Sequence, residues 1–220
     1  MLPATPKLNY WRDRARAEIE AAFKALAAHT WERSTDQERA SALIERRADL
    51  LAAVDEIPSV GEGTVLTRIH GDFHLGQVLV SSGDVFIIDF EGEPARALEE
   101  RRAKASPLRD VAGLLRSLDY VVATIKDRKK VGAASLSNER TEAFLDRFRS
   151  MATKAFMKAY LTAAGEDRAV NKQLLNLLLI EKAAYEINYE AASRPGWLPV
   201  PLAGLAALAQ NIFDSPRGRP

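Results

Sequence analysis

The sequence predicts a mainly α-helical chain that encloses one small β element, and three observations support this fold class. Apolar residues recur at helical spacing over most of the 220 residues. Between residues 61 and 95 the pattern changes to short runs of Val, Leu, Ile and Phe around Gly and Ser, which is typical of strands and turns. At roughly 150 residues per domain, the length favours one large domain over two.

Residues 1–60 are expected to be helical. Two apolar stripes lie in this region, the first at Trp11, Ala15, Ile19, Phe23 and Leu26 and the second at Ala40, Leu43, Ile44, Leu50, Leu51 and Val54. Pro58, Gly61 and Gly63 then interrupt the helical period. The opening region should therefore end near residue 60.

Residues 61–95 are expected to form the β element. A short strand is predicted in TVLTRIH, directly before His70, and the string QVLVSSGDVFIIDF predicts a hairpin. Its two apolar runs flank the turn-forming residues Ser81, Ser82, Gly83 and Asp84.

Residues 96–214 are expected to form a helical subdomain, in which helix returns from Ser106 onward. Ser106 is suited to an N-cap and Pro107 to the first helical position, and the helix that follows carries an apolar stripe at Leu108, Val111, Leu114, Leu115, Leu118, Val122 and Ile125. Further helices are expected near 139–164, 168–193 and 200–213, and residues 215–220 are expected to be a disordered tail.

Composition excludes several classes of function. The chain has no cysteine, so disulfide frameworks, thiolate metal sites and cysteine nucleophiles are excluded. The formal net charge is +1, which predicts no nucleic-acid partner and no attraction to a membrane surface. The first residues do not resemble a signal peptide. A soluble, cytoplasmic protein is the expectation.

Acidic residues are concentrated in one apolar stretch. Residues 72–93 contain no Lys or Arg and hold Asp72, Asp84, Asp89, Glu91 and Glu93. If a strand continued through VFIIDFE, Asp89 and Glu91 would lie on the same face and could share a cation. Oxygen ligands of this kind favour Mg²⁺. The alternative is that these carboxylates are ordinary loop residues at strand ends.

The string RIHGDFHLGQ predicts a reactive loop. Gly71 permits a tight turn, so that Asp72 can project into a cleft and accept a proton from an attacking hydroxyl. Gln77 offers a neutral oxygen to a metal. His70 is interpreted as a structural histidine that stabilises the loop, and His74 either braces the loop or faces the substrate.

These residues resemble a known family. HGDFHLGQVL followed by IIDFEGEP resembles the aminoglycoside phosphotransferase and choline kinase group, which carries an HGDxHxxN loop and an IDF metal motif. The longer strings DFEGEPARALEERRAKASPLRDVAGLLRSLDY and EKAAYEINYEAASRPGWLPVPLAGL are similar to bacterial maltokinases. Those enzymes transfer phosphate from ATP to the anomeric hydroxyl of maltose and are often fused to a trehalose synthase domain.

The resemblance implies roles at matching positions. Asp72 becomes the catalytic aspartate with His74 beside it, Gln77 a metal ligand where the wider group has Asn, Asp89 the main Mg²⁺ ligand and Glu91 a second one. Asp110 matches a position that stabilises the loop together with His70. A carboxylate in the first turn of a helix would also complement the helix dipole, which explains Asp110 nearly as well.

Two further groups complete the predicted site. Arg96, Arg101 and Lys104 could neutralise the charge of the transferred phosphoryl group or pair with Glu93 and Glu99. Sugar-binding candidates are Glu181, Tyr185, Asn188 and Trp197, because helical spacing places the first three on one face and a tryptophan can stack on a sugar ring. The alternative is that the aromatic residues only cap the core.

By the same resemblance, the chain is expected to be a single C-terminal lobe of a protein-kinase-like fold over residues 1–214. The sequence lacks a GxxxxGK[ST] motif and the nucleotide-binding N-terminal lobe, so weak or absent turnover alone is expected. The expected ligands are ATP, Mg²⁺ and maltose, with the missing lobe or a fused trehalose synthase domain as partner.

The sequence allows two other interpretations of function. A non-catalytic interaction or sugar-binding module with the same fold is the main alternative. A two-metal phosphoesterase is disfavoured because such sites need more histidines than His29, His70 and His74.

Overall fold

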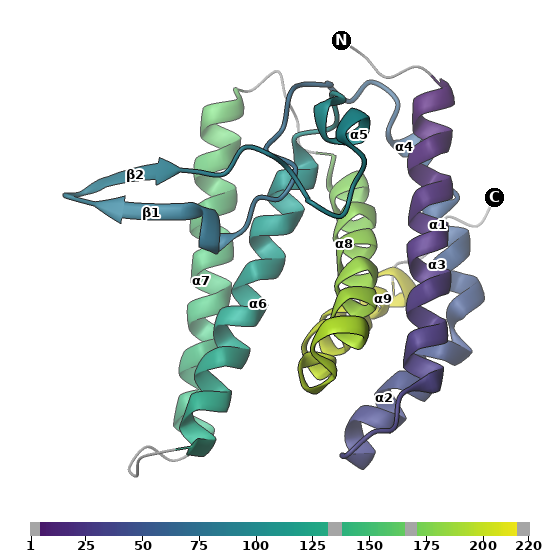
Figure 1. Cartoon of the computed structure of the whole chain (residues 1–220), viewed down its shortest axis with the longest axis vertical. Coiled ribbons are helices and arrows are strands. Elements are labelled where there is room, and N and C mark those ends of the chain that lie inside the picture. The colour runs from purple at the N-terminus through teal and green to yellow at the C-terminus, as the bar shows by residue number, and fades with distance from the viewer. Residues whose placement is uncertain (1–4, 132–137, 166–170, 215–220) are drawn as a thin grey trace.

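The computed structural model describes residues 5–131, 138–165 and 171–214, and helices make up most of this part of the chain (Figure 1). The predicted tail at 215–220 lies outside the described residues. The expected mainly helical fold with a two-stranded sheet is confirmed.

The main core lies where α1 (Thr5–Ala28), α8 (Lys172–Ser193) and α9 (Pro199–Asp214) meet. The shorter helices α2 (Ser34–Glu45), α3 (Arg47–Val54) and α4 (Ile57–Val60) pack around α1 and α9. Ile19, Ile187 and Leu202 are fully buried in this core. Burying a side chain of this size stabilises the fold by about 1.5–3 kcal/mol.

A second layer is formed by the antiparallel pair α6 (Leu108–Val131) and α7 (Asn138–Ala164). Figure 1 shows α8 between α6 on one side and α1 on the other. A smaller apolar cluster joins α6 to α8 through Leu108, Val111, Leu174 and Leu178. Because α8 contacts both layers, it can present side chains to both.

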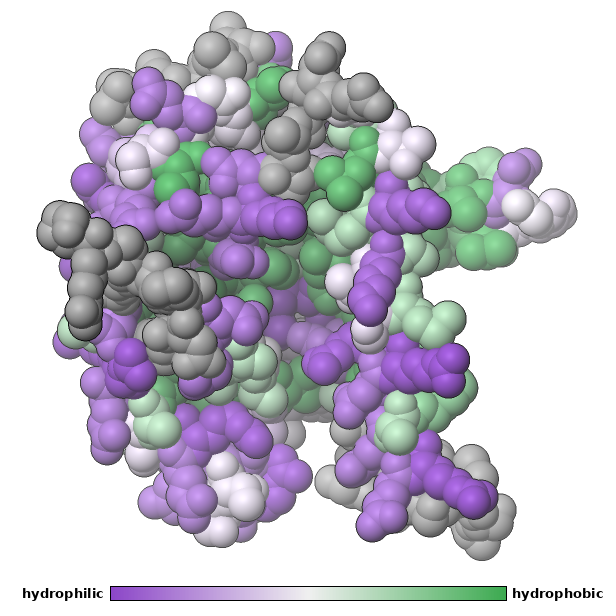
Figure 2. Space-filling view, turned by 180° about the vertical axis from the view of Figure 1, so that it is seen from behind, coloured by the Kyte–Doolittle hydropathy of each residue, from purple (hydrophilic) through white to green (hydrophobic). Residues whose placement is uncertain are grey.

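The predicted hairpin is present as β1 (Val78–Ser81) and β2 (Asp84–Ile87), with Val78 opposite Ile87 and Ser81 opposite Asp84. Ser82 and Gly83 both have positive φ values, of 52° and 86°, which defines a type I′ turn. The hairpin projects from the helices and carries exposed apolar side chains on both faces (Figures 1 and 2).

The strand predicted in TVLTRIH is wrong. This segment makes one isolated bridge, in which Thr67 and Ala105 exchange two backbone hydrogen bonds of 3.0 Å. The apolar run has strand-like composition but no neighbouring strand with which to form a ladder. The bridge instead holds the chain before the 70–77 loop against the segment after α5 (Leu98–Arg102), a short helix that the sequence did not predict.

Helix starts follow local capping signals. The Ser106 hydroxyl accepts a hydrogen bond from the Leu108 N–H at 3.3 Å, as its predicted capping role requires. For α8 the capping residue is Asn171, whose side chain accepts from the Leu174 N–H at 2.9 Å. The earlier start predicted at 168 lies outside the described residues. Across the described helices, none combines the length and apolar character that crossing a bilayer requires.

Candidate functional site

The 70–77 loop is held on the side of α6. The Asp110 carboxylate accepts hydrogen bonds from the backbone N–H groups of His70 at 2.7 Å and Gly71 at 2.9 Å. The Ser117 hydroxyl, two turns further along α6, accepts from the Leu75 N–H at 3.2 Å. Burial raises the pKa of Asp110, and the two loop N–H groups oppose that rise.

His70 connects the loop to the end of the hairpin. Its Nε2 lies 2.7 Å from the Ile88 carbonyl oxygen and therefore donates a proton to it. Its Nδ1 accepts from the Asp72 N–H at 3.4 Å, so one neutral tautomer satisfies both contacts. The ring is almost fully buried. His70 thus fixes the backbone at Asp72 relative to the residue before Asp89.

A chain of polar contacts joins the two predicted key carboxylates. His74 Nε2 lies 3.8 Å from Asp72 Oδ2 and 3.4 Å from the Gln77 amide nitrogen. That amide nitrogen donates to Asp89 Oδ2 at 3.1 Å. His74 Nδ1 accepts from the Gly76 N–H at 3.0 Å, which fixes the ring. The structure therefore places Asp72, His74, Gln77 and Asp89 in one continuous cluster.

Gln77 and Asp89 suit Mg²⁺ as a pair. Mg²⁺ typically takes one or two protein oxygens and completes its shell with phosphate oxygens and water, so a carboxylate beside an amide oxygen is a sufficient donor set. A turn of the Gln77 amide would bring its oxygen beside the Asp89 carboxylate. Among the described residues, no three His, Cys, Asp or Glu side chains converge as a metal site, so phosphate oxygens would have to contribute.

The predicted pairing of Asp89 with Glu91 on one strand face is wrong. Strand β2 ends at Ile87, and Asp89 adopts a left-handed φ of 62° beyond that end. The alternation of side chains that would align the two carboxylates stops with the strand. Glu91 is exposed, and its backbone carbonyl accepts a hydrogen bond from Arg101 at 3.2 Å.

Asp72 faces a cavity of about 430 Å³, which is lined by parts of α1, the 70–77 loop, α5, α6 and α8. This volume lies in the usual range for small-molecule sites. On the α8 side, Lys182 Nζ lies 3.8 Å from Asp72 Oδ1 and 4.8 Å from the centre of the Tyr185 ring. Gln77 and Asp89 do not line this cavity, so Asp72 lies between it and the metal-ligand candidates.

The three predicted cations all line the cavity, but their partners differ from those expected. Arg96 pairs with Glu100 at 2.6 Å and lies over the Tyr185 ring, so the expected pairing with Glu93 or Glu99 is wrong. Arg96 lies just before α5, and its guanidinium reaches Glu100 in that helix. The backbone carbonyl of Lys104 accepts a hydrogen bond from the Lys7 side chain.

The predicted sugar-binding residues separate into two groups. Glu181 and Tyr185 line the cavity. Asn188 and Trp197 do not, and their placement in the same site is wrong: Asn188 donates to Glu18 on α1 at 2.9 Å, and Trp197 stacks on Tyr120. Asn188 shares a helix face with Glu181, but seven residues advance it by about 10 Å along the axis, beyond the cavity.

Tyr185 is held as a hydrogen-bond donor. Burial raises the pKa of its phenol, and a hydrogen bond to the negatively charged Glu93 raises it further. The phenol therefore stays protonated at neutral pH.

Comparison with known proteins gives the family. The family model described as "Phosphotransferase enzyme family" matches residues 1–119, which is more than half of the chain. The chain belongs to this family.

Two curated relatives of this phosphotransferase are named glucosamine kinase. This chain is 28% identical over 201 residues to the glucosamine kinase from Streptacidiphilus jiangxiensis, and the match covers 90% of this chain and 42% of the relative. It is 32% identical over 166 residues to the one from Mycolicibacterium smegmatis (strain ATCC 700084 / mc(2)155), covering 74% of this chain and 39% of the relative. The chain thus spans less than half the length of either curated relative.

Solved structures share the fold of this phosphotransferase. A glucosamine kinase in complex with glucosamine, ADP and inorganic phosphate superposes with a TM-score of 0.78 at 24% identity, covering 97% of this chain and 50% of the other. A second crystal form of a glucosamine kinase gives a TM-score of 0.76 at 25% identity, covering 94% and 47%. These likenesses confirm the expected kinase-like fold.

Sequence reasoning missed three residues that line the cavity of this phosphotransferase. Arg14 comes from α1 and Arg109 from α6, and both pair with Glu181. Lys182 pairs with Asp72. Burial raises the pKa of Glu181, and the charges of Arg14 and Arg96 oppose that rise. A buried carboxylate without a partner is costly, so Glu181 itself was the signal that arginines should lie nearby.

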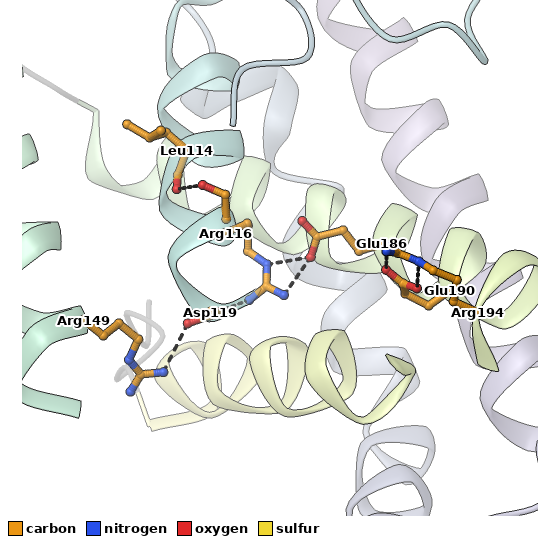
Figure 3. Close-up of polar contacts among 8 residues, drawn as sticks. Leu114, Arg116, Asp119, Arg149, Glu186, Glu190 and Arg194 are labelled. Carbon is orange, nitrogen blue, oxygen red and sulfur yellow. Dashed lines mark hydrogen bonds and ion pairs between the residues drawn. The ribbon is translucent and has the colours of Figure 1, made fainter. Parts of the chain in front are cut away.

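A second ion-pair cluster lies away from the loop (Figure 3). Arg116, buried on α6, donates to Glu186 on α8 from Nε at 2.9 Å and from Nη2 at 2.7 Å, and its Nη1 donates to Asp119. Arg149 on α7 donates to Asp119 at 3.2 Å. All three guanidinium nitrogens of Arg116 therefore have carboxylate partners. This cluster ties α6, α7 and α8 together.

Proposed function

We propose that this chain is the C-terminal, acceptor-binding lobe of a sugar kinase that transfers the γ-phosphoryl group of ATP to a sugar hydroxyl. One observation carries the proposal: Asp72 faces the cavity, and a chain of polar contacts connects it to the Gln77 and Asp89 pair. A base on the acceptor side and metal ligands on the other side are what phosphoryl transfer requires. A nucleotide-binding lobe outside this chain would hold the rest of ATP.

The residues of the site act mainly by positioning. The acceptor hydroxyl lies against Asp72 and gives its proton to that carboxylate as the bond between its oxygen and the γ-phosphorus forms. The bond from the γ-phosphorus to the β–γ bridging oxygen breaks, and ADP leaves. Asp110 and His70 hold the loop that carries Asp72. Gln77 and Asp89 would hold Mg²⁺, which supplies charge neutralisation on the phosphates.

Maltose is the acceptor that we propose, because the maltokinase-like strings include the α5 and α8 residues that line the cavity. The relatives named glucosamine kinase make glucosamine the second candidate. The local charges favour the neutral sugar, since the ammonium group of Lys182 already lies beside Asp72 and Arg96 lies over Tyr185. A second ammonium group in this space would be repelled.

The test is a measurement of ADP release with ATP, Mg²⁺ and either maltose or glucosamine. It compares this chain with a longer polypeptide that includes any upstream coding region. In the longer polypeptide, Asp72→Asn should lower the maltose-dependent rate by about 10²- to 10⁴-fold, the usual contribution of a placed base. Asp84→Asn, at the exposed hairpin turn, is the matched control and should leave the rate unchanged.

An unchanged rate in Asp72→Asn would contradict the role of Asp72, and a faster rate with glucosamine would contradict the proposed acceptor. The second candidate function is an interaction module that docks to a trehalose synthase domain, and the exposed apolar hairpin favours it. Val80 and Val85 are 75% and 63% exposed. Maltose binding without ADP release from either polypeptide would support the module.

A further inference from the structure

Two ion pairs of the same kind join α6 to α8, but only one is complete. Arg116 and Glu186 form the complete pair, in which every guanidinium nitrogen has a carboxylate partner (Figure 3). In the other pair, Arg109 Nη1 donates to Glu181 Oε1 at 3.0 Å. Arg109 Nη2 and Glu181 Oε2 are buried and have no hydrogen-bond partner among the described residues.

Arg14 adds a third unpaired atom. Its two terminal nitrogens donate to Glu100 and to Glu181 Oε1, whereas its Nε is buried without a partner in the described part of the chain. An unsatisfied buried polar group costs about 1–3 kcal/mol, and a native structure rarely keeps several together without a role for them. Arg14, Arg109 and Glu181 all line the cavity that Asp72 faces.

The unpaired atoms select the chemistry of a ligand. Arg109 Nη2 and Arg14 Nε can only donate, and Glu181 Oε2 can accept. A carboxylate or phosphate would satisfy the donors but face the Glu181 carboxylate. An ammonium group would satisfy Glu181 but face Arg14, Arg109 and Lys182. A hydroxyl both donates and accepts, so two neighbouring hydroxyls satisfy the cluster without adding charge.

We propose that Arg14, Arg109 and Glu181 form a subsite that binds a pair of neighbouring hydroxyls on a neutral sugar. The inference rests on the proposed function and deepens it by naming the residues that bind the acceptor away from the reacting hydroxyl. Successive residues on a helix point about 100° apart, so α8 directs Lys182 towards Asp72 and Glu181 towards α1 and α6. The acceptor is therefore held at two separate points, the reacting hydroxyl at Asp72 and the hydroxyl pair at Glu181.

The experiment measures maltose binding by titration calorimetry without ATP, so that it does not depend on phosphoryl transfer. Glu181→Gln keeps the shape of the side chain but removes its charge. It should weaken maltose binding by about 10- to 100-fold, the effect of losing hydrogen bonds to a charged group. Glu186→Gln is the matched control, because Glu186 is also a buried α8 glutamate paired with an α6 arginine. It should change the maltose affinity by less than about 2-fold, a difference too small to distinguish from no effect.

Circular dichroism reports whether each variant folds. If Glu181→Gln does not fold, Arg109→Lys tests the same subsite. Arg109→Lys should also weaken maltose binding by about 10-fold, because a lysine cannot reproduce the guanidinium fork. Equal maltose affinity in the wild type and Glu181→Gln would overturn the subsite. Tighter binding of glucosamine or gluconate than of maltose would overturn the neutral-sugar assignment, and so would binding of no sugar at all.

The two proposals fail in distinguishable ways. Maltose binding that depends on Glu181, in a protein that releases no ADP, would refute the kinase and support the subsite. ADP release that depends on Asp72, with maltose affinity unchanged in Glu181→Gln, would refute the subsite and support the kinase.

Discussion

Replacing Gly113 with alanine tests how tightly the 70–77 loop is held on α6. Gly113 lies inside α6, where alanine is normally favoured over glycine by about 1 kcal/mol. Here, however, an added Cβ would lie 2.5 Å from the Phe73 carbonyl oxygen. Ordinary contact begins at 3.4 Å, so the loop and the helix would have to separate by 3.4 − 2.5 = 0.9 Å.

The loop cannot yield this distance freely, because Asp110 and Ser117 hold it on both sides of Gly113. Overpacking of this kind costs about 1–3 kcal/mol, and a contact with backbone favours the upper end. After subtraction of the helix-propensity gain, Gly113→Ala should lower the free energy of unfolding by about 1–2 kcal/mol. A shift near 1 Å at Asp72 should also slow phosphoryl transfer, by up to about 10²-fold.

Urea denaturation measures the first effect and ADP release by the longer polypeptide measures the second. Gly196→Ala is the control, because a Cβ there meets nothing within 4 Å. It should stay within about 0.5 kcal/mol of the wild type. If Gly113→Ala instead raised the free energy of unfolding by about 1 kcal/mol, the close approach of loop and helix would be refuted.

Two further predictions concern buried polar groups. Arg116→Met should lower the free energy of unfolding by about 3–5 kcal/mol, because it leaves the buried Glu186 carboxylate without its cation. In urea denaturation, adding Glu186→Gln should recover part of the loss, and full additivity of the two changes would contradict the pairing. The second prediction concerns Tyr185, whose pKa is higher in the folded than in the unfolded chain. Its contribution to stability is therefore complete below the phenol pKa of the unfolded chain, which is about 10. That contribution is lost as the pH rises towards the higher pKa of the folded chain. Tyrosinate absorbance should therefore show a late-titrating phenol that Tyr185→Phe removes, and an unchanged titration in that variant would contradict the burial of this hydroxyl against Glu93.

Features that depend on neighbouring residues could be predicted from the sequence. The positive φ values of Ser82 and Gly83 follow from turn-forming residues between two apolar runs, and Ser106 precedes its helix at capping distance. The 70–77 loop is only partly of this kind. The contacts of His74 with Gly76 and Gln77 are local, whereas Asp110 and Ser117 on α6 hold the loop from a distance along the chain. The roles of its residues were predicted from the family resemblance.

Features that depend on distant contacts could not be predicted. Arg14 lies 167 residues from Glu181, and charged residues make up 28% of the chain, so the sequence does not say which of them pair. The prediction that Asn188 lies in the sugar site failed for another reason. Helical spacing determines on which face of the helix a residue lies, but not where along the helix the cavity ends. The strand predicted before His70 failed because β structure needs a partner that a single run cannot supply.

Helix α6 connects the loop to the proposed subsite. Asp110, Gly113 and Ser117 lie along one stripe of the helix and hold the loop. Arg109 and Arg116 lie along a second stripe, about 100° away, and hold α8. Because both stripes belong to one rigid helix, any rotation of α6 that moved Arg109 from Glu181 would also move Asp110 from the loop. The Arg116 ion pair lies two turns further along the second stripe, so α6 is joined to α8 at two separate points, and the Arg109 pair with Glu181 does not depend on the Arg116 pair with Glu186.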